Sequence, residues 1–228
     1  MISQAESKKS LSFIDINTIS PIYCNPKKAW KELLESIENI YKNFKKSEID
    51  PEEIKVILNI DEKNKNNVPD VISVDYVIAI INRYIHDYKI SNATAPFLEF
   101  KRHSAIYLFS IGSQEKALEL LKEILTVVSD VTNLTNPDIN LTCIRDCVRL
   151  NQASIHFWLG DFEESRQLLE KVITYYESTS EELYLIKMAN FISVGFTYLA
   201  WIYTKINEFE DAERAFLHSL KVMKLVKQ

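Results

Sequence analysis

A similar ten-residue phrase occurs three times in the sequence: GSQEKALELL at residues 112–121, GDFEESRQLL at 160–169 and NEFEDAERAF at 207–216. The copies start 48 and 47 residues apart, and each opens a run of acids and apolar residues. A phrase that returns at a nearly fixed spacing is typical of a repeat architecture. We interpret each copy as the turn between two antiparallel helices, with the helix pairs stacked along the chain.

A constant pattern of side-chain sizes surrounds each phrase. A small residue in the preceding helix is followed twelve residues later by a second small residue, then four residues on by a large apolar one, and three further by a medium or small one. Small residues let two helices approach closely, and the large residue fills the gap beneath them. We call these twelve positions the repeat grid: Ala105, Ala117, Leu121, Ile124; Ala153, Ser165, Leu169, Val172; Ala200, Ala212, Phe216, Ser219.

Composition supports an all-α fold. The chain has 228 residues, of which 46% are hydrophobic and 26% charged, so it can bury a full core. It has only three glycines, which leaves little turn chemistry for β-hairpins. The net charge of −5 and the absence of a long basic block in the sequence argue against nucleic acid as a ligand.

Helix starts are marked by prolines that follow good N-cap residues, as at Asn25-Pro26, Asp50-Pro51 and Asn136-Pro137. We expect an extended arm at 1–25, a helical N-terminal region at 26–95, and helical repeats at 96–228. The repeats divide into the pairs 96–131, 137–178 and 181–227. Individual helices are expected near 26–46, 51–60, 70–90, 96–111, 113–131, 137–159, 161–178, 181–206 and 208–227.

The repeats resemble the tetratricopeptide repeat (TPR) family. The last copy is the most similar, through Phe196, Leu199, Ala200, Tyr203, Ala212 and Phe216. The other copies depart from the family pattern at Ser104, Gln152 and Ser165, and the period of 47 to 48 residues exceeds the family's usual length of about 34. The resemblance implies an elongated TPR-like α-solenoid of three antiparallel helix pairs after an irregular helical region.

Family members hold extended or helical peptides on the concave face that their first helices form. The resemblance therefore implies a partner-binding groove lined from the first helix of each pair. The alternative is that these side chains belong to the core, because longer helices pack differently. The nine positions are Arg102, Ile106 and Phe109; Leu150, Ser154 and Phe157; Thr197, Trp201 and Thr204.

Some TPR proteins grip the C-terminal carboxylate of a chaperone with lysine, asparagine and arginine on their first helices. Arg102 and Asn151 match that pattern, whereas Ile106, Val194 and Tyr198 do not. Too few donors remain to hold a carboxylate. A chaperone co-factor of this kind is disfavoured.

The stretch PFLEFKRHSAIYLFSIGSQEKALELL, residues 96–121, is similar to a helix pair in the TPR subunit of the TRAPP vesicle-tethering complex. The similarity covers one repeat. We expect a non-enzymatic scaffold or adaptor that binds protein partners as a subunit of a larger complex, with vesicle tethering as a narrower possibility. The alternative is a TPR regulator that responds to a peptide or small ligand.

No catalytic, cofactor or metal site is expected. The sequence has no glycine-rich phosphate loop, nucleophile elbow or paired-acid motif. Cys143 and Cys147 lie four residues apart, but structural zinc needs four ligands and no second pair is near. We interpret both as buried free thiols.

The C-terminal helix is apolar on two sides. We expect Ala212, Phe216 and Leu220 to face its own partner helix, which leaves a second apolar side for another chain or a second copy of this one. The residues of this predicted capping interface are Ala215, Val222, Met223 and Val226. Alternatively, the N-terminal arm folds back over it through Phe13, Ile14, Ile16 and Ile19.

Seventeen uncharged residues, MANFISVGFTYLAWIYT at 188–204, come close to the length of a membrane span. Asn190, Ser193, Thr197 and Thr204 dilute this stretch, so we expect a buried helix with no integral membrane span. The start of the sequence lacks the apolar region of a secretion signal, and three cysteines cannot all pair with one another. These features predict a reducing compartment, the cytosol or the nucleus, and of these we expect a cytoplasmic protein.

Overall fold

The computed structural model describes residues 25–44, 71–87, 94–132 and 138–226. These residues form eight α-helices and no strand. The predicted helix at 51–60 and the predicted arm, apart from Asn25, lie outside the described residues. The helices are α2 (Pro26–Phe44), α4 (Val71–Asp87), α5 (Ala95–Ser110), α6 (Gln114–Thr132), α7 (Ile139–Leu159), α8 (Phe162–Ser178), α9 (Glu182–Lys205) and α10 (Phe209–Val226).

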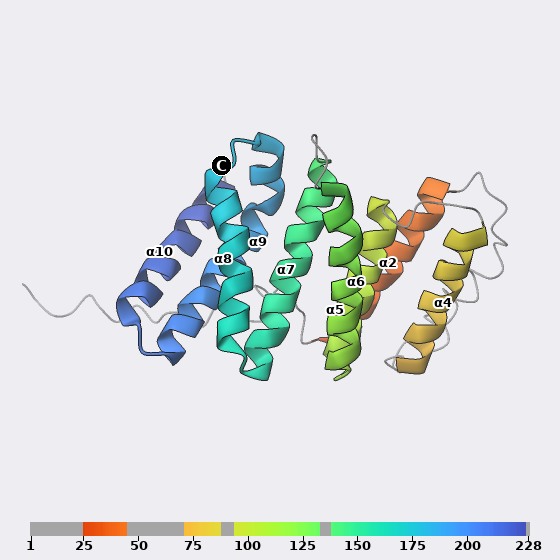
Figure 1. Ribbon diagram of the computed structural model, residues 1–228, viewed down its shortest axis with the longest axis horizontal. Coiled ribbons are helices and arrows are strands. Elements are labelled where there is room, and N and C mark those ends of the chain that lie inside the picture. Colours follow the sequence, from red (N-terminus) through yellow and green to blue (C-terminus); the bar gives the residue numbers. More distant parts are fainter. Residues whose placement is uncertain (1–24, 45–70, 88–93, 133–137, 227–228) are drawn as a thin grey trace, which may run out of the picture.

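The helices stand side by side in a single elongated stack (Figure 1). Three antiparallel pairs, α5 with α6, α7 with α8 and α9 with α10, follow one another along it. Each first helix packs on the first helix of the next pair, and α6 and α8 also pack on the first helix that follows them. Helix α2 packs along α5, and α4 adds a smaller contact to α5. The fold is a TPR-like α-solenoid, as the repeated phrase predicts.

The first residue of each repeated phrase makes the turn possible. Gly112, Gly160 and Asn207 have φ angles of 87°, 89° and 64°, in the left-handed region that glycine and asparagine tolerate best. The following amide donates to a carbonyl five residues back, over 2.8 to 2.9 Å, in all three turns. This is the Schellman ending of a helix. The phrase therefore recurs because the same helix stop is used three times.

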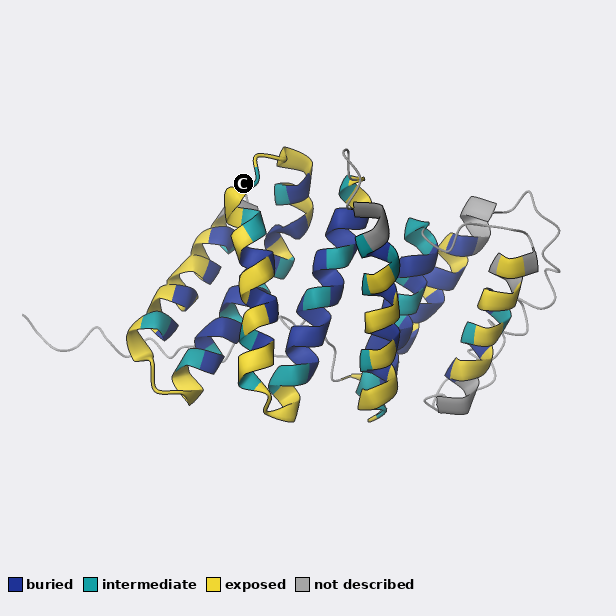
Figure 2. Cartoon of the chain, viewed as in Figure 1, coloured by how far each residue is buried: buried dark blue, intermediate teal, exposed yellow. Residues whose placement is uncertain are grey.

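The residues of the repeat grid lie in the packed interior of the stack. Eleven of its twelve side chains are at most 5% exposed, which confirms the register of the helix pairs. Phe216 is the exception, at 38% exposed. Figure 2 shows the buried residues on the sides where neighbouring helices face each other, with exposed residues on the outward sides.

A buried carboxylate joins α7 to α9. Asp146 has no exposed surface, and it accepts hydrogen bonds from Arg145 at 2.9 and 3.0 Å and from Arg149 at 3.0 Å. Tyr184 of α9 donates its hydroxyl to the same carboxylate at 2.8 Å. Burial, followed by the charge of Asp146, raises the pKa of the Tyr184 hydroxyl far above its ordinary value. The hydroxyl therefore stays protonated and acts as a permanent donor.

Helix α9 is the most apolar part of the stack. Among the described helices, it has the length and composition that would allow a helix to cross a membrane. In the structure it packs against α7, α8 and α10, and 56% of its most apolar window is buried. At Gly195, α9 lies close to both α7 and α8, because a Cβ atom there would lie 3.2 Å from Leu150 and 3.7 Å from Leu169.

Candidate functional site

The nine predicted groove residues do not line one surface. Ile106, Leu150 and Ser154 are buried, which contradicts their prediction as a binding surface. Phe109, Phe157, Thr197 and Trp201 are partly buried, and Thr204 is exposed. Arg102 is buried but lies in the wall of a cavity, as described below.

The reason for these corrections is the way the first helices are enclosed. Helix α5 packs against α2, α6 and α7, which together leave Ile106 inside the core. Ser154 donates its hydroxyl back to the carbonyl of Leu150 at 2.9 Å within α7. Residues at these helix positions therefore serve packing between helices.

Phe157 and Trp201 belong to an aromatic cluster between α7 and α9. The ring of Phe157 lies 5.9 Å from that of Trp201, 5.1 Å from that of Tyr198 and 5.6 Å from that of Phe162, measured between ring centroids. Such edge and tilted contacts are favourable beyond the area they bury. The cluster holds the C-terminal halves of α7 and α9 together, and its rings are only partly available to a ligand.

Two adjoining cavities lie instead along the N-terminal halves of the first helices. One cavity of about 400 Å³ lies between α2 and α5, and a second of about 290 Å³ lies across α5, α7 and α9. Both are bounded by Ala95 and Glu99, so they meet at α5. We call this surface the furrow; its residues are Glu32, Glu35, Ser36, Asn39, Ala95, Pro96, Glu99, Arg102, His103, Asn140, Cys143, Ile144, Cys147, Lys187, Met188 and Phe191.

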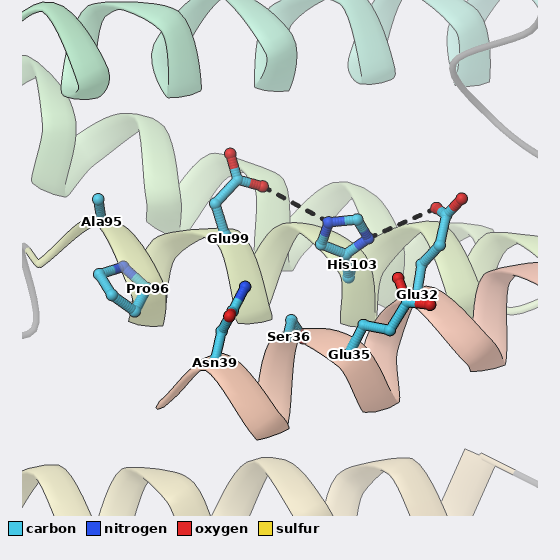
Figure 3. A pocket seen from close by; sticks show the side chains of 8 residues that line it. All are labelled: Glu32, Glu35, Ser36, Asn39, Ala95, Pro96, Glu99 and His103. Carbon is cyan, nitrogen blue, oxygen red and sulfur yellow. Dashed lines mark ion pairs between the residues drawn. The ribbon is translucent and has the colours of Figure 1, made fainter. Parts of the chain in front are cut away.

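His103 lies between two carboxylates at the α2 end of the furrow (Figure 3). Its Nδ1 atom is 3.6 Å from Glu32, and its Nε2 atom is 3.6 Å from Glu99. Arg102 lies 3.0 Å from Nε2 through Nη2. Because arginine can only donate, Nε2 must be the acceptor, which puts the imidazole proton on Nδ1 and toward Glu32.

The imidazole of His103 is neutral at physiological pH. Burial, assisted by the positive charge of Arg102, lowers the pKa of His103 to about 2. The positive charge of Arg102 is balanced by Glu99, which accepts from its Nε atom at 2.7 Å. Glu32 and Glu35 place two carboxylates at this end of the furrow, and the Nζ atom of Lys31 lies 3.8 Å from the carboxylate of Glu35.

Arg102 and Asn151, the two residues that match a carboxylate clamp, bind each other. The Nη1 atom of Arg102 donates to the side-chain oxygen of Asn151 at 3.3 Å. The other guanidinium nitrogens of Arg102 contact Glu99 and His103. The guanidinium is thus held by three side chains of the protein itself.

The α7–α9 end of the furrow has different chemistry. Lys187 is exposed and donates to the side-chain oxygen of Asn140 at 2.6 Å. Cys143 and Cys147 are free and buried beside it, and the sulfur atoms of Cys147 and Met188 are 3.8 Å apart. Burial raises the pKa of both thiols, to about 12 for Cys147, so neither is a reactive thiolate at neutral pH.

The α2 wall of the furrow was missed by reasoning from sequence. Glu32, Glu35, Ser36 and Asn39 lie one turn apart along one side of α2, which is a usable signal for a shared face. That signal becomes a site only once α2 is known to pack along α5, and no resemblance covers this region.

The predicted C-terminal capping interface is wrong for two of its residues. Ala215 and Val222 are buried against α9, together with Ala212 and Ser219, whereas Phe216 and Leu220 point outward. Small residues at the crossing let α10 approach α9 closely, so the larger side chains are turned away from it. Met223 is partly buried, and the side chain of Val226 lies outside the described residues.

The comparisons with known proteins agree with the architecture. Residues 149–182 match the family description Tetratricopeptide repeat, and this range covers the C-terminal half of α7, all of α8 and the following turn. The comparisons with curated proteins and with solved structures gave no match. By its helix pairs, its turns and this matched repeat, the described part of the chain is an all-α, TPR-like solenoid of a type that generally binds other proteins.

Proposed function

We propose that this chain is a non-enzymatic scaffold that holds a segment of a partner protein in the furrow. The matched repeat at 149–182 supports the class, because TPR repeats are typically interaction modules. The observation that carries the proposal is the pair of adjoining cavities across α2, α5, α7 and α9. A surface that crosses four helices in succession suits an extended or helical segment of a protein.

The charges of the furrow suggest the chemistry of that segment. Glu32 and Glu35 lie at the α2 end, and Lys187 lies at the α9 end. Phe191, on the same helix as Lys187, is partly exposed and offers apolar surface beside it. The fitting segment has lysine or arginine over α2, an apolar side chain near α9, and an acidic or polar group beside Lys187.

Several narrower roles remain predictions within this proposal. They are membership of a larger complex, a part in vesicle tethering, a cytoplasmic location, and contact with other subunits through α10. The rival proposal is a regulator whose stack changes curvature when a peptide or small ligand binds. A chain recovered alone, whose melting temperature rises with a small metabolite, would favour the regulator.

The test is affinity purification from the native cell with quantitative mass spectrometry. The variant Glu32→Gln/Glu35→Gln removes the two carboxylates that α2 contributes to the furrow while preserving side-chain size. The matched control is Glu115→Gln/Glu119→Gln on α6, where both carboxylates are exposed away from the furrow. A partner retained by the wild type and the control but lost from the furrow variant supports the proposal. Equal recovery with all three proteins contradicts it.

A further inference from the structure

The outward side of α10 carries four exposed, large apolar side chains. The exposed fractions are 63% for Phe209, 38% for Phe216, 57% for Leu217 and 47% for Leu220. We call these four residues the end face. Exposed apolar residues that gather on one helix usually mark an interface.

A comparison of equivalent positions in the repeat grid indicates which kind of structure fits the end face. Phe216 occupies the position of Leu121 in α6 and Leu169 in α8, and both leucines have no exposed surface. In both earlier pairs the first helix of the next pair packs on this second helix, α7 on α6 and α9 on α8. At Gly195 of α9, a Cβ atom would lie 3.7 Å from Leu169 and 3.9 Å from Ile173.

Leu220 corresponds to Ile173 in the same alignment of repeats, and it is exposed whereas Ile173 is buried. Phe216 and Leu220 therefore lie on the surface that an earlier pair offers to the first helix of the next pair. Leu217 lies beside that surface, because its counterparts Lys122 and Glu170 are exposed. An α-helix that lies along α10 would complete the packing already used twice in this stack.

The charges of α10 select the occupant. Glu210 and Glu213 are exposed in its N-terminal half, and Lys221 and Lys224 are exposed in its C-terminal half. A second α10 helix running antiparallel, with the two Leu217 residues at the symmetry axis, places Glu210 opposite Lys224 of the second copy. The same register places Glu213 opposite Lys221 of the second copy.

We propose that two copies of this chain pair through their α10 helices, antiparallel and related by a two-fold axis at Leu217. Such an interface is self-complementary in shape and in charge. It uses the end face and leaves the furrow on each copy open. The proposal is therefore independent of what the furrow binds.

Sedimentation velocity of the full chain, from about 1 to 200 μM, tests the pairing. The wild type is expected to shift from monomer to dimer with concentration. Leu217→Asp should remain monomeric at every concentration. Tyr76→Asp is the matched control, since Tyr76 is 59% exposed on α4, and it should dimerise like the wild type. Circular dichroism checks that all variants keep their helicity.

Charge reversal tests the antiparallel register. Glu210→Lys/Glu213→Lys should weaken the dimer at least tenfold, and adding Lys221→Glu/Lys224→Glu in the same chain should restore it. Parallel pairing gives a different result, because it sets like charges together in the wild type and gains nothing from the second pair of changes. A wild type that stays monomeric, or a dimer that Leu217→Asp leaves intact, overturns the proposal. A chain that dimerises only after residues 1–24 are removed also overturns it, since the arm would then be the native occupant.

Discussion

Ser165 of α8 donates its hydroxyl to the backbone carbonyl of Ala153 in α7 at 2.7 Å, and neither side chain has exposed surface. The two residues are twelve apart in the sequence and meet where the helices of the pair cross. Ala105 with Ala117, and Ala200 with Ala212, occupy the same positions in the other pairs. The two small residues in each repeat of the grid therefore mark the point at which the helices of a pair cross.

The first prediction concerns Ser165 itself. Ser165→Ala should lower the free energy of unfolding by no more than about 1 kcal/mol, because the other two pairs already use alanine here and the change removes one hydrogen bond without leaving a buried donor. Ser165→Leu should cost about 1 to 3 kcal/mol through overpacking. Urea denaturation followed by circular dichroism measures both. Equal stability of the two variants would show that this crossing is not tightly packed.

A second prediction concerns the alanines of the first helices. Ala153→Trp and Ala200→Trp place the largest side chain at fully buried crossing points, which should destabilise the stack by about 3 kcal/mol or more, beyond the usual cost of overpacking. The melting temperature by calorimetry is the measurement. An unchanged melting temperature in both variants would refute the register of the repeats.

Third, Tyr184→Phe should reduce stability by about 1 to 3 kcal/mol. The change removes the only donor that α9 gives to the buried carboxylate of Asp146 among the contacts seen in the described residues. Tyr203→Phe, on the same helix and only partly buried, is the control and should change stability little. If both variants unfold at the same urea concentration as the wild type, the link between α7 and α9 contributes nothing.

Fourth, stability should depend on pH through His103. In the unfolded chain its imidazole has an ordinary pKa near 6.5, whereas in the folded chain the pKa is about 2. Below pH 6.5 the unfolded state therefore binds a proton that the folded state does not, and stability falls as the pH falls. The variant His103→Gln lacks the imidazole that binds this proton in the unfolded state.

The comparison of the two proteins isolates the effect of His103 from that of nearby Glu32, Glu99 and Arg102. The wild type should lose about 1 kcal/mol more stability per pH unit than His103→Gln between pH 6 and pH 4. Chemical denaturation at a series of pH values measures this difference. Parallel pH profiles would mean that His103 takes up a proton in the folded state without cost.

The sequence predicts the architecture well because the signals are local. The helix bounds from α5 onward fall within two residues of those expected. Gly112, Gly160 and Asn207 stop helices through their own backbone preferences, and the grid records the contacts of each pair within about twenty residues of chain. Short-range periodicity carries that kind of information.

The candidate site was harder to predict because it depends on how separate helices face one another. The furrow requires α2 to lie along α5, and the sequence between them gives no sign of this contact. Ile106 and Leu150 look like groove residues by analogy with shorter repeats, but longer first helices are enclosed on more sides. The predicted orientation of α10 was wrong for a similar reason. The sequence allows either Ala215 or Phe216 to face α9, and close packing of the two helices selects the smaller residue.

Photo-crosslinking in the native cell tests most directly whether the furrow holds a partner segment. A photoreactive amino acid is placed at Glu35 or at Lys187, at the two ends of the furrow, and at Glu119 on α6 as the control. We expect Glu35 and Lys187 to crosslink to neighbouring parts of one segment in the same partner protein, with no such product from Glu119. Crosslinks from Glu119 to that partner in equal yield, or none from either end of the furrow, would contradict the account.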